Sequence, residues 1–168
     1  MLKGMPNLRR AFIRIMVCYA TLAWVAPGHG AQTPAGSPPA SFEAVNVCER
    51  VSGDAVAKAL EATLLEVRPV NVKGLTAARC VYRLQMGGAP RAFVLWLNPP
   101  ADYDGLRKAA SGSVKPVSGL GAAAHLTFDG ETKRYTLTAV KPERVTIQVT
   151  GEQVDWLQAI ARLALSKF

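Results

Sequence analysis

The chain is poor in the residues that most often catalyse reactions or bind metal ions. It has only two histidines and three cysteines in 168 residues. His29 and Cys18 lie in the first thirty residues, which leaves His125, Cys48 and Cys80 for the rest of the chain. A zinc site built on His125 would need carboxylates at matching positions, and the sequence has none in register with it. We therefore predict no metal site, no cofactor and no catalytic residue.

Short motifs that can mark an active site are incomplete in this sequence. The serine of Ser118-Gly119-Leu120-Gly121 is not part of a Gly-x-Ser-x-Gly turn, and the same segment lacks the third glycine of a dinucleotide site. Asp102-x-Asp104-Gly105 begins like a calcium loop but lacks the later glutamate. An acidic first turn of a helix explains these aspartates better.

The first thirty residues have the order of a secretory signal peptide. Four basic residues and no acidic residue precede or adjoin an apolar run, Ile15–Ala26, and small residues follow at Pro27–Ala31. The apolar run is shorter than the roughly 20 residues that a membrane span needs. We therefore predict that residues 1–30 are removed and that the protein is exported to the periplasm or secreted. No transmembrane helix is expected in the mature protein.

Cys18 allows a second interpretation, because a cysteine at such a place can accept a lipid after cleavage. The residues before it are Ile15, Met16 and Val17, where a lipoprotein signal peptidase requires small side chains. Removal of Cys18 with the signal peptide is therefore favoured over lipidation.

The charge of the whole chain overstates that of the mature protein. Twenty basic and twelve acidic residues give a net charge of +8. Removing the four basic residues of the signal peptide leaves 16 against 12, or +4. This charge is not clustered, so we predict no nucleic-acid partner.

A Pro/Ala/Ser-rich linker, residues 31–41, and a single domain, residues 42–168, are expected after the signal peptide. In an oxidising compartment Cys48 and Cys80 are expected to form a disulfide, which would tie the first helix of the domain to a strand. Ser52 is a plausible N-cap of that helix. Its apolar face is expected to hold Val51, Ala55, Val56, Ala59 and Leu60.

Seven strands and two further helices are predicted beyond the first helix. The expected strands are Thr63–Val70, Ala78–Met86, Arg91–Leu97, Val114–Val117, Ala122–Phe128, Arg134–Val140 and Arg144–Thr150. A short helix should follow Asn98-Pro99-Pro100, and a last helix should start at a capping box of Thr150 and Gln153. Most of the circumference of that last helix, Trp156 included, is expected to be buried. The predicted class is α+β, a mostly antiparallel sheet of about seven strands packed with three helices.

Strand alternation separates core positions from candidate binding positions. The core face is expected to hold Cys80, Tyr82 and Leu84, opposite Phe93, Leu95 and Leu97, and in the later strands Ala124, Leu126, Phe128, Val145, Ile147 and Val149. On the other face lie Arg79, Arg83 and Trp96. An arginine stacked on Trp96 is either a site for an anionic group or a stem that covers the aromatic ring.

His125 is the other candidate ligand-binding residue. It shares the second face with Thr127, Thr136, Thr138, Thr146 and Gln148. This hydroxyl-rich face could bind a polar ligand such as a glycan, or it is the solvent-facing side of an antiparallel sheet.

Three segments together resemble a group of small secreted or lipid-anchored bacterial envelope domains of unknown function. They are Cys48 with the Ala-rich helix VSGDAVAKAL, Cys80 in the strand ARCVYRL, and the segment PVSGLGAAA at 116–124. Those domains resemble in turn the PsbP-like α/β/α sandwich. The resemblance covers about residues 42–168 and implies a binding or accessory module without catalytic residues.

The sequence therefore favours an exported, non-enzymatic envelope protein that binds a partner protein, a cell-wall component or a small ligand. Two alternatives stay open, a hydrolase or enzyme inhibitor with an unrecognised site, and a periplasmic assembly or stress factor.

The export prediction has a direct test in the mature N-terminus. Because the apolar run gives way to small residues there, the first residue of the exported protein should lie between Gly28 and Gln32. Intact-mass spectrometry of protein recovered from the periplasm or the medium measures this. An intact Met1, or a lipid on Cys18, would contradict it.

Overall fold

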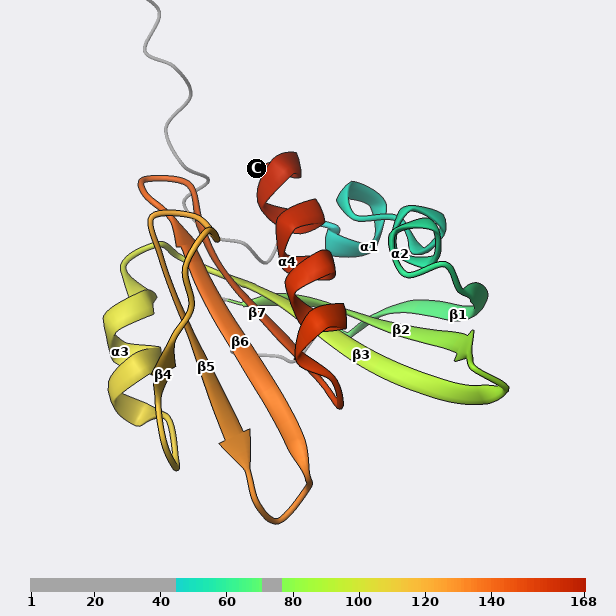
Figure 1. The fold of residues 1–168 in the computed structure, drawn as a ribbon. Coiled ribbons are helices and arrows are strands. Elements are labelled where there is room, and N and C mark those ends of the chain that lie inside the picture. The colour runs from blue at the N-terminus through green and yellow to red at the C-terminus, as the bar shows by residue number, and fades with distance from the viewer. Residues whose placement is uncertain (1–44, 71–76) are drawn as a thin grey trace, which may run out of the picture. The chain divides into compact units, whose positions relative to one another are not determined.

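The chain forms one seven-stranded antiparallel sheet with helices on both faces (Figure 1). The structure is a computed structural model that describes residues 45–70 and 77–168. The predicted α+β class and the mostly antiparallel sheet of about seven strands are confirmed. The predicted signal peptide, Cys18 and linker lie outside the described residues.

The strands do not follow one another across the sheet in chain order. The elements are α1 (Val47–Arg50), α2 (Gly53–Ala59), β1 (Thr63–Val70), β2 (Ala78–Met86), β3 (Ala89–Asn98), α3 (Asp102–Ala109), β4 (Lys115–Pro116), β5 (Ala123–Asp129), β6 (Arg134–Lys141), β7 (Val145–Gly151) and α4 (Val154–Lys167). Their order in the sheet is β1-β2-β3-β7-β6-β5-β4. The first three strands of the chain and the last four therefore meet where β3 pairs with β7. Strands β1 and β4 form the two edges of the sheet.

One face of the sheet holds the core, as the alternation of the strands predicts. Cys80 pairs with Leu95 and Tyr82 with Phe93 in the β2–β3 register, and all four side chains are buried. Leu95 in turn lies opposite Val149 of β7, which continues the same face. The helices α1, α2 and α4 cover this face, whereas α3 lies on the other (Figure 1).

The β2–β3 hairpin is tighter than the sequence predicts. We expected a connection of four residues, Gly87 to Pro90, but Met86 already pairs with Ala89 and the turn is Gly87-Gly88. Both glycines have positive φ, 55° and 81°. Two adjacent residues of positive φ match the right-handed twist of the flanking strands, which lets the chain turn in two residues.

The N-terminal helical region is broken in two. A short extra helix, α1, precedes the predicted one, and Ser52 caps α2 as expected, with its hydroxyl accepting a hydrogen bond from the Ala55 N–H at 3.3 Å. The buried positions of α2 are not all as predicted, because Ala57 is buried and Ala59 is exposed. The face of α2 that meets β1 and α4 is therefore rotated from the expected one.

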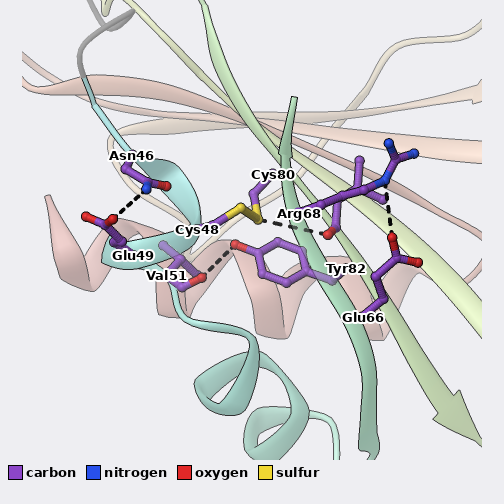
Figure 2. The surroundings of a disulfide bond; sticks show 9 residues. Asn46, Cys48, Glu49, Val51, Glu66, Arg68, Cys80 and Tyr82 are labelled. Atoms are coloured by element: carbon purple, nitrogen blue, oxygen red, sulfur yellow. Dashed lines mark hydrogen bonds and ion pairs between the residues drawn. A yellow bond between two sulfur atoms is a disulfide. The ribbon is translucent and has the colours of Figure 1, made fainter. Parts of the chain in front are cut away.

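The predicted disulfide joins Cys48 of α1 to Cys80 of β2 (Figure 2). Beside it, the buried Tyr82 hydroxyl donates a hydrogen bond of 2.7 Å to the carbonyl oxygen of Val51. Burial raises the pKa of Tyr82, so its hydroxyl stays protonated as the donor. Two side chains of β2 thus hold α1 and Val51, the residue that follows it, on the sheet.

The capping box predicted for the last helix is wrong. The backbone of Thr150 remains in β7, paired with Val94 and Thr136, and its hydroxyl lies 3.1 Å from the Thr136 hydroxyl. Gln153 is the N-cap residue and makes no capping hydrogen bond with its side chain. Sheet pairing continues to Gly151, so Thr150 belongs to β7 and does not act as the cap of α4.

The extent of burial expected for α4 is also wrong. The helix buries one stripe, which consists of Leu157, Ile160, Ala161 and Ala164. Trp156 is only partly buried, with its ring edge-on to Phe93 at a centroid distance of 6.0 Å. A helix that lies on the surface of one sheet covers one side only, so the remaining apolar residues border solvent.

The β4 edge differs from the prediction in two respects. The strand contains only Lys115 and Pro116, where Val114–Val117 was expected. Phe128, expected in the core, is 37% exposed and packs against Tyr135 at 4.8 Å between ring centroids. Because Lys115 pairs with Leu126, β4 offers no partner beside Phe128.

Opening the disulfide should destabilise the domain measurably. The bridge spans 32 positions of the chain, and loop-closure entropy for such a span corresponds to about 3–4 kcal/mol. Reduction should therefore lower the urea midpoint clearly, because net stability of a domain this size is only ~5–15 kcal/mol. The Cys48→Ala/Cys80→Ala variant should start from the lower midpoint and not respond to reductant. Equal midpoints for the oxidised and reduced wild type would contradict the role assigned to the bridge.

Candidate functional site

Among the described residues, one short helix, α3, covers part of the second face of the sheet. Its first turn holds Asp102 and Asp104, as predicted, and its last turn holds Arg107 and Lys108, where the helix dipole favours basic residues. The Thr146 hydroxyl donates a hydrogen bond of 3.2 Å to the Pro100 carbonyl oxygen. This bond ties the segment that leads into α3 to β7.

His125 lies under α3, packed against an aromatic side chain. The rings of Tyr103 and His125 are 5.2 Å apart between centroids and meet edge to face. His125 and Thr138 are each only 2% exposed, and Thr146 is fully buried. The prediction of a solvent-facing side is therefore wrong for these three residues, because α3 and the segment that leads into it lie over this part of the sheet.

Three of the four predicted ligand-binding residues lie in one row across the sheet. The register pairs Arg79 with Trp96, Trp96 with Gln148, Gln148 with Thr138, and Thr138 with His125. Trp96 and His125 are three strands apart in this row, roughly 14 Å at the usual strand spacing. The row is continuous, but its two ends are too far apart to contact one small ligand.

Arg79 and Trp96 form one end of the row. The Arg79 guanidinium lies 4.4 Å from the centroid of the Trp96 ring, so the predicted stacking is present. Arg83 is elsewhere on the same strand and contacts Glu66 at 3.2 Å. The structure thus brings Arg79 and Trp96 together and leaves Arg83 in a surface ion pair.

A cavity of about 620 Å³ opens between α3, β4 and β5, and we name it the α3 pocket. It is lined by Tyr103, Arg107, Lys108, Val114, Pro116, Val117, Ala123, Ala124 and His125. Of these residues the sequence singled out only His125 as a ligand-binding candidate. Four of the others, Pro116, Val117, Ala123 and Ala124, belong to the segment PVSGLGAAA, which carried only the resemblance. The lining residues come together because α3 packs against the β4 edge.

The imidazole of His125 has hydrogen-bonding capacity that the described residues do not use. Its Nδ1 is buried and has no hydrogen-bond partner among them. Burial, and then the positive charge of Arg107, hold the pKa of His125 below its usual value of 6.5. The ring is therefore neutral at neutral pH, with one nitrogen able to donate and the other able to accept.

Buried polar atoms without a partner are found elsewhere in the described part of the fold, but with different surroundings. They are Arg91 Nε, Arg134 Nε and Asn98 Nδ2, none of which belongs to a residue that lines the α3 pocket. His125 therefore combines an unused polar atom with a cavity large enough for a small molecule.

The charge at the α3 pocket is positive. Arg107 and Lys108 belong to its lining, and none of the described residues that line it is an aspartate or a glutamate. Asp104 lies 3.8 Å from the Arg107 Nε, but both side chains are more than half exposed, so this ion pair is weak. The burial of Tyr103 raises the pKa of its hydroxyl, which therefore contributes no negative charge at neutral pH.

Residues 45–70 and 77–168 contain neither a metal-binding cluster nor a membrane-spanning helix. Within these ranges there is no group of three or more His, Cys, Asp or Glu side chains that could hold a metal ion. No helix in these ranges combines the length and the apolar character needed to cross a membrane.

Comparisons with known proteins give no family for this chain. No protein-family model and no curated protein matches it. A crystal structure of a GTP binding regulator from Thermotoga maritima is similar over 67% of this chain and 87% of that chain, with 11% identity and a TM-score of 0.42. A similarity this low carries no argument about this protein, and the PsbP-like resemblance stays a prediction.

The lowered pKa of His125 predicts how stability responds to pH. In the unfolded chain His125 is protonated near pH 6.5, whereas in the folded protein it is protonated only at a lower pH. The free energy of unfolding should therefore fall as the pH drops through 6.5 towards the folded pKa. Urea midpoints at pH 7.5 and 5.5 measure this fall, and part of it should be absent in His125→Gln. Identical pH dependence in the wild type and the variant would contradict the buried, neutral state of His125.

Proposed function

We propose that this protein is an exported, non-enzymatic domain of the cell envelope that binds a small ligand in the α3 pocket. The observation that carries the proposal is the pocket itself, a cavity of about 620 Å³ whose lining includes His125, a residue whose buried Nδ1 has no partner among the described residues. Small-molecule sites have volumes of about 300–1,000 Å³ and combine apolar walls with a few polar groups.

The composition of the pocket lining supports a binding role. Apolar contact comes from Val114, Pro116 and Val117 before, within and after β4, and from the alanines of β5. Polar recognition comes from His125 and from the basic end of α3. A ligand that satisfied the imidazole would gain a hydrogen bond that the described residues do not supply.

The Cys48–Cys80 disulfide supports the export part of the proposal, because such bonds persist mainly in oxidising compartments. The predicted signal peptide points to the same compartment. The resemblance to PsbP-like envelope domains implies a binding or accessory module, which agrees with a pocket that serves recognition.

Fragment binding followed by NMR tests the proposal without knowledge of the natural ligand. Binding of fragments should shift the amide signals of Tyr103, Ala123 and His125, because ligand sites are where small fragments bind best. Ala123 is exposed and lines the pocket, so Ala123→Leu should fill part of the cavity and weaken these fragments. Ala122→Leu is the matched control, since Ala122 is exposed but does not line the pocket.

Two results would contradict the proposed function. One is a set of fragment hits whose shifts map to another part of the domain. The other is equal weakening of the fragments by Ala123→Leu and Ala122→Leu, which would mean that the effect is not occupation of the pocket.

A further inference from the structure

We propose that the ligand of the α3 pocket is an amphipathic monoanion, a compound with one acidic group and an apolar body. The inference rests on the proposed function and names the class of ligand for that site. The natural compound would carry a carboxylate or a comparable acid on a ring system or a short chain.

The lining of the pocket divides into a cationic part and an apolar part. Arg107 and Lys108 are consecutive on the last turn of α3, and both line the cavity. The rest of the wall is largely apolar and includes Val114, Pro116 and Ala123. A ligand that is charged at one end and apolar at the other would contact both parts, whereas a cation would be repelled by the first and a sugar poorly matched to the second.

The positive charge at the pocket is only weakly compensated by the described residues. Asp104 is the acidic group that pairs with Arg107, and its side chain is 74% exposed at a distance of 3.8 Å. An exposed ion pair of this kind contributes little to stability. The Lys108 ammonium has no ion-pair partner in the described part of the chain. An incoming anion would therefore meet two basic groups and displace at most one weak contact.

His125 adds a neutral donor beside these cations. Arg107 is close enough for its charge to lower the pKa of the imidazole, and both residues line the same cavity. A neutral imidazole presents one N–H, which can donate to an acid oxygen, and hydrogen bonds to an ionised acceptor are stronger than those to a neutral one.

A matched pair of probes separates the charge from the apolar body. The probes are 1-naphthaleneacetate and 1-naphthaleneacetamide, which have the same ring system and nearly the same shape but differ by one negative charge. In titrations of the oxidised protein at pH 7.5 and low salt, the acid should bind roughly five-fold more tightly than the amide. This preference should fall towards unity as salt is added.

Variants assign the preference to the two cations. In Arg107→Gln/Lys108→Gln the acid and the amide should bind within about two-fold of each other, because only the attraction between charges is lost. Arg144→Gln/Lys167→Gln removes two exposed basic groups that do not line the pocket, and it should keep the wild-type preference. Ala123→Leu should weaken both probes together, since it fills the space that the ring system occupies.

The outcomes distinguish failure of the inference from failure of the proposed function. Equal affinity of the acid and the amide, both weakened by Ala123→Leu, would overturn the monoanion and leave a neutral ligand in the pocket. The monoanion would likewise be overturned if fragments occupied the pocket but neither probe bound. A preference for the acid that survives Arg107→Gln/Lys108→Gln would also overturn it. Fragments that bind only elsewhere would overturn the proposed function itself.

Discussion

The side chains of the central strands alternate between two faces, and α1, α2 and α4 bury one of them. This burial requires Cys80, Leu95 and Val149 to lie in register across β2, β3 and β7. Because the period of a strand is two, each neighbour of a core residue is directed to the opposite face. The packing of the core face therefore fixes the positions of Trp96 and Thr138 on the opposite face. The other residues of the second face are placed in the same way.

The second face is wider than α3, the one helix that the described residues place on it, can cover. The α3 helix is eight residues long and lies over the part of the sheet near His125 and Thr138. The result is a covered region beside β4 and β5 and a second region, where Arg79 lies over Trp96, that none of the described helices covers. Since β4 contains only two residues, the boundary of the covered region is incompletely packed, and the α3 pocket lies there. The functional proposals follow from this mismatch between a wide sheet and a short helix.

Prediction from the sequence succeeded where a local pattern and the tertiary structure require the same thing. Ser52 caps α2, the acidic first turn of α3 is as expected, and Cys48 is joined to Cys80. It failed where two local patterns compete for the same residues. Thr150 has the sequence of a capping residue, but strand pairing with Thr136 and Val94 retains it in β7. It also failed for Trp156, whose apolar neighbours on α4 predicted burial. This side chain lies at the border of the contact between α4 and the sheet and is only partly buried.

The sequence by itself determined the class of the fold, the alternation of the strands and the separation of the core residues from the residues of the second face. These properties depend on the spacing of side chains a few positions apart, so they can be read from a single chain. Only the tertiary structure decided which part of the second face is buried and where a pocket forms. Arg107 and His125 are 18 positions apart with a turn and β4 between them, and nothing local to either residue requires them to meet. Their proximity arises because α3 folds back over β5 and β6, an arrangement that depends on the packing of the whole sheet.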